Sequence, residues 1–84
     1  MPNKPIPPVG LVVACSETDL GFRNSNTPCL RIVFAHGHWQ VSPTKERGLL
    51  VYITQPAKIA LSAVKAVRLT EVNAYVAKAE IADV

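Results

Sequence analysis

The strongest constraint on this chain is an alternation of apolar and polar residues around one His-Gly pair. Large apolar residues occupy every second position on both sides of this pair, namely Leu30, Ile32, Phe34, Trp39 and Val41. A period of two is typical of β-strands, and His36 and Gly37 are residue types that accept the positive φ of a tight turn. The pattern predicts a β-hairpin in which Phe34 lies opposite Trp39, and both side chains face the core.

The outward face of this hairpin is the candidate binding surface. It combines polar and apolar side chains with basic residues of the following turn, and its members are Arg31, Val33, His38, Gln40, Lys45 and Arg47. The strand at 38–42 also contains no Lys or Glu that would discourage its edge from pairing with another chain. We therefore expect a sheet edge or face to dock onto a protein partner, with homodimer formation as an alternative use of the same surface.

The hairpin belongs to a predicted α+β domain. Short runs rich in strand-forming residues predict a small antiparallel sheet of about four strands, at 10–16, 30–35, 38–42 and 49–54. The last of these runs is apolar throughout, which is typical of a central strand. Pro56 then opens an amphipathic helix at 56–68, whose apolar stripe is expected to cover one face of the sheet.

The segment 70–82 fits two structures. Its content of Ala, Lys and Glu favours a second helix. The alternative is a strand, because Tyr75, Ala77, Ala79 and Ile81 occupy alternate positions.

One domain accounts for the whole length of 84 residues. Four prolines fall within residues 1–9, so this stretch is expected to form an extended arm. The remaining residues, 10–84, are expected to form a single α+β domain. No apolar run approaches the roughly 20 residues of a membrane-spanning helix, and two cysteines are too few for a disulfide framework. We therefore expect a cytoplasmic protein.

Nucleic-acid binding is an alternative function. The chain has 9 basic and 6 acidic residues, for a net charge of +3, but they form no dense basic cluster. Arg31, His38, Lys45 and Arg47 would supply a basic hairpin surface. With Phe34 and Trp39 directed inward, however, that surface lacks the aromatic platform on which bases stack.

A small zinc-stabilised domain is the other alternative. Cys15, Cys29, His36 and His38 are the right ligand types for a tetrahedral site, but their spacing does not match a zinc knuckle. No nucleophile, paired carboxylate or phosphate-binding loop is indicated either, so we expect no enzymatic activity and no cofactor. Small chains without a catalytic signature are often accessory or inhibitor proteins, including those of bacteriophages and other mobile elements, and we expect such a role here.

Overall fold

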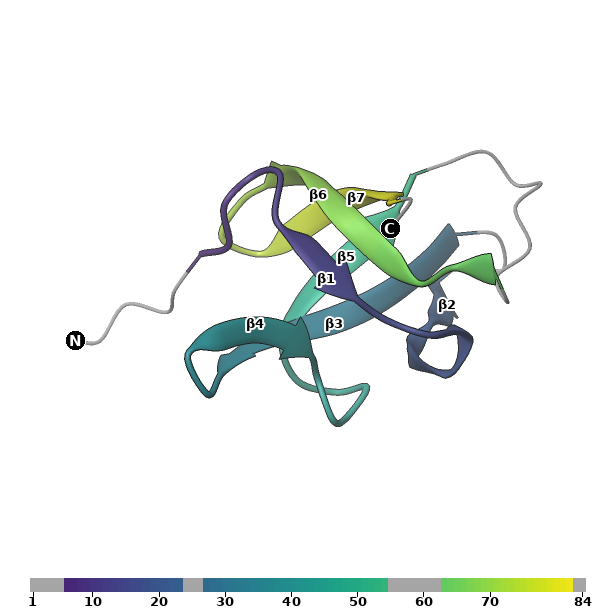
Figure 1. Ribbon diagram of the computed structural model, residues 1–84, viewed down its shortest axis with the longest axis horizontal. Helices are drawn as coiled ribbons and strands as arrows, with labels where there is room; N and C mark the ends of the chain where they lie inside the picture. Colours follow the sequence, from purple (N-terminus) through teal and green to yellow (C-terminus); the bar gives the residue numbers. More distant parts are fainter. Residues whose placement is uncertain (1–5, 24–26, 55–62, 83–84) are drawn as a thin grey trace.

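The computed structural model describes residues 6–23, 27–54 and 63–82, and these ranges are built mainly of β-strands (Figure 1). The strands are β1 (Val12–Ala14), β2 (Gly21–Arg23), β3 (Thr27–Ala35), β4 (His38–Val41), β5 (Leu49–Ile53), β6 (Ala66–Val72) and β7 (Val76–Ile81). A short 3-10 turn, η1 (Glu17–Asp19), lies between β1 and β2. The predicted α+β class is therefore wrong, and the described part of the domain is all-β.

All seven strands belong to one mixed sheet. Its order is β1-β6-β7-β5-β3, and β2 and β4 pair with opposite ends of β3. Neighbouring strands are antiparallel except β5 and β7, which run parallel. Because β4 lies beside β1, the sheet curls into a nearly closed barrel (Figure 1). The expected purely antiparallel sheet of about four strands is thus replaced by a larger mixed one.

The central hairpin has the predicted register. Phe34 lies opposite Trp39 and Ile32 opposite Val41, and the turn residues His36 and Gly37 have φ values of 54° and 82°. The Phe34 and Trp39 rings meet edge to face, with centroids 5.5 Å apart. Burial differs from the prediction, because Phe34 is 50% exposed whereas Ile32 on the same face is completely buried.

The helix predicted at 56–68 is contradicted where the structure describes this segment. Residues 55–62 lie outside the described residues, and β6 begins at Ala66. Val67 is fully buried, with Val13 of β1 on one side and Ile81 of β7 on the other. Val64 and Val67 would share the apolar stripe of the predicted helix. Both are buried, but Val64 precedes β6 and Val67 lies within it.

The helix predicted at 70–82 is also wrong, and the alternative strand is present as β7. Ala77 and Ala79 face the interior and are completely buried. Their outward neighbours form cross-strand ion pairs with β6, Lys78 with Glu71 at 3.5 Å and Glu80 with Arg68 at 3.1 Å. The high helix propensity of Ala, Lys and Glu is overridden because small side chains fit the crowded inside of a narrow barrel.

The core fills the inside of the barrel. It consists mostly of aliphatic side chains at alternate strand positions, including Val13, Leu30, Ile32, Val51, Ile53, Val67 and Leu69. No polar or charged residue is buried in the described ranges. Hydrophobic burial therefore supplies the main stabilising term, as in other small domains.

Gly48 allows the chain to enter β5 close to β3. Its φ is +106°, and a Cβ added there would lie 2.5 Å from the carbonyl oxygen of Ile32 and 2.9 Å from Cγ1 of Val33. Gly48→Ala should therefore lower the free energy of unfolding by about 2 kcal/mol or more, measured by urea denaturation.

Gly10→Ala is the matched control for this prediction. Gly10 also has a positive φ, +93°, but no atom lies within 4 Å of its added Cβ. The control should show only the backbone cost of about 1 kcal/mol. Equal losses in the two variants would show that the close approach to Ile32 is unimportant.

Candidate functional site

An uncharged groove lies at the end of the barrel, between the β3–β4 hairpin and the β6–β7 turn. Its volume is about 800 Å³, and no Lys, Arg, Asp or Glu is among the described residues that line it. Phe34 and Trp39 come from the hairpin, Leu49 from the start of β5, and Tyr75 from the turn. We call this feature the aromatic groove.

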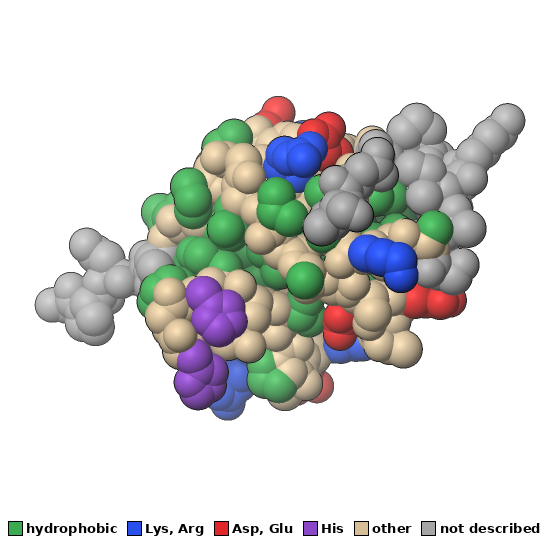
Figure 2. Space-filling model, viewed as in Figure 1, with side chains coloured by type: hydrophobic (Ala, Val, Ile, Leu, Met, Phe, Trp, Pro, Cys, Tyr) green, Lys and Arg blue, Asp and Glu red, His purple; other side chains and the backbone are tan. Residues whose placement is uncertain are grey.

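Large apolar side chains are exposed at the aromatic groove. Phe34 is 50% exposed, Tyr75 88%, and Ile6 of the N-terminal segment 61%. In Figure 2, hydrophobic side chains reach the surface on the same side of the molecule as the two histidines of the hairpin tip. Exposed apolar side chains gathered in one place, rather than scattered singly, are typical of an interaction surface.

The groove exists because β3 continues beyond the start of β5. The ladder between these strands ends at the pair Ile32–Leu49, while β3 runs on to Ala35 with β4 alone beside it. The loop before β5 does not replace the missing strand, since no backbone hydrogen bond joins 43–48 to 33–35. One edge of β3 is therefore open at the groove.

Tyr75 is held in place by the turn that carries it. The side-chain oxygen Oδ1 of Asn73 accepts hydrogen bonds from the backbone N–H groups of Tyr75 and Val76, at 2.8 and 2.9 Å. The N–H of Asn73 also donates to the carbonyl of Val76, at 3.0 Å. The exposed phenol ring therefore projects from a fixed backbone, which reduces the entropy lost when a partner binds it.

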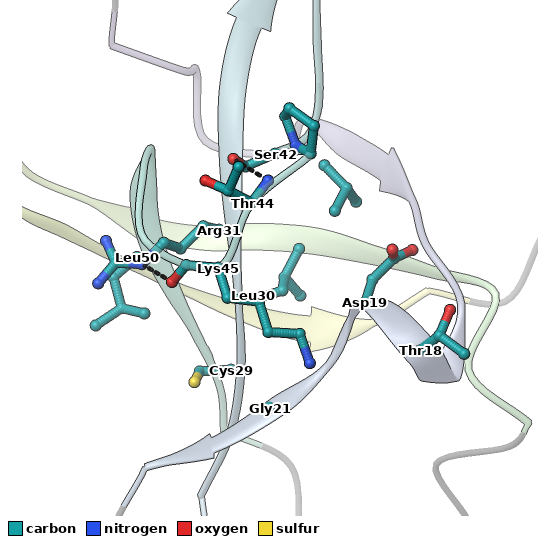
Figure 3. Close-up of a pocket in the computed structure, with 12 residues that line it drawn as sticks. Thr18, Asp19, Gly21, Cys29, Leu30, Arg31, Ser42, Thr44, Lys45 and Leu50 are labelled. Atoms are coloured by element: carbon teal, nitrogen blue, oxygen red, sulfur yellow. Dashed lines mark hydrogen bonds between the residues drawn. The ribbon is translucent and has the colours of Figure 1, made fainter.

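The residues predicted to form one binding face are divided by the structure. Val33 lines the aromatic groove, whereas Arg31 and Lys45 line a separate pocket of about 330 Å³ near η1 (Figure 3). His38 lies at the exposed hairpin tip, and Arg47 is exposed in the loop before β5. The amide of Gln40 donates to the Ala35 carbonyl at 3.1 Å and supports the hairpin.

The pocket near η1 is formed by groups that already have structural tasks. The Arg31 guanidinium donates to the carbonyls of Lys45 and Gly48, both at 3.0 Å. The carboxylate of Asp19 accepts hydrogen bonds from the N–H and hydroxyl of Ser16. Figure 3 shows the Lys45 side chain crossing the pocket from the loop. Arg31 therefore fixes the loop, and this pocket is a weaker candidate than the aromatic groove.

Among the described residues, neither a zinc site nor a nucleophilic cysteine has an arrangement that would support it. Cys15 and Cys29 are both free thiols, and no three His, Cys, Asp or Glu side chains converge anywhere in the described ranges. Partial burial raises the pKa of the Cys15 thiol, and the nearby Asp19 carboxylate raises it further. A nucleophilic cysteine needs the opposite shift.

The residues that distinguish the groove were not among those predicted. The sequence predicts that Phe34 and Trp39 face the core, and it places Tyr75 in a helix or a strand. Asn73 is the sequence signal that indicates a turn beside Tyr75, because Asn side chains accept hydrogen bonds from nearby backbone N–H groups in turns.

No protein-family model matches the chain, and neither a curated protein nor a solved structure is significantly similar to it. Within the part that the structure describes, no helix is both long and apolar enough to cross a membrane.

Replacing Arg31 should loosen the loop before β5. In Arg31→Gln, trypsin should cleave after Lys45 and Arg47 about tenfold faster, because two charge-assisted hydrogen bonds are lost. Arg68→Gln is the control, since it removes an ion pair on the distant β6–β7 face. Similar acceleration in both variants would contradict the assigned role of Arg31.

The Cys15 thiol should react slowly at neutral pH. In a Cys29→Ser background, alkylation by iodoacetamide should reach half its maximal rate at a higher pH in the folded chain than in urea, because the folded state has the raised pKa. Asp19→Asn should shift the half-maximal pH of the folded chain part of the way toward the value in urea, because it removes the nearby negative charge. A folded profile at or below the unfolded one would contradict this assignment.

Proposed function

We propose that this protein is a non-enzymatic protein-binding module whose partner docks into the aromatic groove. The observation that carries the proposal is the exposure of Phe34 and Tyr75 on either side of an uncharged groove. Aromatic residues are enriched at the centres of protein interfaces, where charged residues are depleted. This docking surface lies at the end of the barrel, whereas the sequence predicts the outward face of the hairpin. Val33 belongs to both surfaces.

The alternative of nucleic-acid binding has less support. Exposed aromatic rings can stack on bases, but single-strand binders combine them with a basic channel for the phosphates. The aromatic groove has no cation in its described lining, and Lys45 lines the other pocket. We therefore propose a protein partner, and we retain an accessory or inhibitor role in the cytoplasm as part of this proposal.

Affinity capture from the native host tests the proposal. The wild-type chain should retain a specific protein, and the double variant Phe34→Ser, Tyr75→Ser should retain it at least tenfold less, because two aromatic anchors are removed. Val12→Ser is the matched control: Val12 is also an exposed apolar residue, at 45%, but lies on β1. Thermal unfolding should show that all three chains are folded.

Two outcomes would contradict this proposal. Equal capture of the same protein by the wild type and the double variant would place the binding surface elsewhere. Capture that disappears after nuclease treatment would favour the nucleic-acid alternative.

A further inference from the structure

The aromatic groove occupies the place where the sheet lacks a strand. β5 pairs with β3 on one side and with β7 on the other, through Ile32–Leu49 and Leu50–Val76 near its start. Beyond that start, β3 continues to Ala35, and the turn containing Tyr75 continues on the other side. The groove is therefore a gap in line with β5, with Phe34 on one wall and Tyr75 on the opposite one.

The backbone of Phe34 faces this gap. Hydrogen bonds of an antiparallel strand alternate between its two edges from one residue to the next. The Arg31 carbonyl accepts from Ser42 on the β4 side, at 2.8 Å. Residues 31, 33 and 35 therefore bond toward β4, and residues 32 and 34 toward β5. Ile32 has Leu49 as its partner there, whereas Phe34 has none among the described residues.

We propose that the partner binds as an added β-strand, paired with the free edge of β3 at Phe34. This inference rests on the proposed function and specifies its geometry. An added strand would accept from the Phe34 N–H and donate to its carbonyl, which completes the alternation that β5 leaves unfinished. Its inward side chain would pack against Phe34, Trp39 and Leu49 and cover the open end of the barrel.

The groove also selects the chemistry of that strand. A charged side chain placed among the described lining residues would meet no opposite charge, so its desolvation would be uncompensated. A β-branched or other apolar side chain would bury the exposed faces of Phe34 and Tyr75 instead. The fitting partner is therefore an extended, uncharged segment with apolar residues at alternate positions.

A synthetic peptide provides the first test. The probe is a capped peptide of about seven residues with alternating valine and threonine, long enough for one strand. On its addition to the full-length protein, hydrogen exchange of the Phe34 amide should slow at least tenfold, as followed by NMR. The same peptide with N-methylated central residues should bind at least tenfold more weakly. No binding of the first peptide, or equal binding of the two, would overturn strand addition.

Two variants at one position separate the backbone from the side chain. Phe34→Ala removes the ring, and Phe34→Pro removes the ring and the N–H, which is not needed for pairing with β4. The proline variant should bind the peptide about fivefold more weakly than the alanine variant, the effect of one hydrogen bond. Equal affinities would contradict the proposal. If the proline variant does not fold, the N-methylated peptide decides the same question.

The outcomes distinguish this inference from the function on which it rests. If the double variant loses its captured protein but the peptide leaves the Phe34 amide unprotected, the groove binds a protein in another way and strand addition is wrong. If the double variant captures normally, the proposed function itself fails. A dimer in light scattering, with the Phe34 amide already protected in the free protein, would assign the edge to a second copy and overturn the proposal.

Discussion

The close approach of Gly48 to the Ile32 carbonyl determines where the β3–β5 ladder ends. A side chain at residue 48 would collide with β3, so glycine lets the chain turn directly into β5 at this point. Before Gly48 the chain leaves the sheet, and its carbonyls at Lys45 and Gly48 are held by Arg31. This one contact thus sets both the start of β5 and the open edge of β3.

The same contact explains why residues on one face of β3 differ in burial. Ile32 and Phe34 both point to the inside, yet Ile32 is completely buried and Phe34 is half exposed. Ile32 still has β5 beside it, whereas Phe34 lies past the last pair of the ladder. The aromatic groove is therefore exposed because β3 is longer than its ladder with β5. Phe34 still points inward, as the alternation along β3 requires.

Local signals were sufficient for the hairpin and insufficient for the C-terminal half. The turn at His36 and the pairing of Phe34 with Trp39 follow from adjacent residues, and both were predicted correctly. At 70–82 the helix propensity of Ala, Lys and Glu favours a helix over the alternative strand, in which Ala77 and Ala79 alternate. Their burial depends on β5, which is distant in sequence, as well as on the neighbouring β6. The exposure of Phe34 likewise depends on where β5 begins. Of the predicted binding residues, Val33 lines the groove, and the others support or surround the hairpin and its loop.

In the proposed docking, the positive charge of the chain and its apolar groove would act at different steps of association. Arg31 donates to backbone carbonyls, and Arg68 forms an ion pair with Glu80. Lys45 and Arg47 are exposed on the loop before β5. A net charge of +3 can attract an acidic molecule over a distance comparable with the Debye length. Once a segment enters the aromatic groove, no described charge lines it. In the proposed binding mode, affinity would come from apolar burial and backbone pairing. The charges would then influence which molecules approach but not which segment fits.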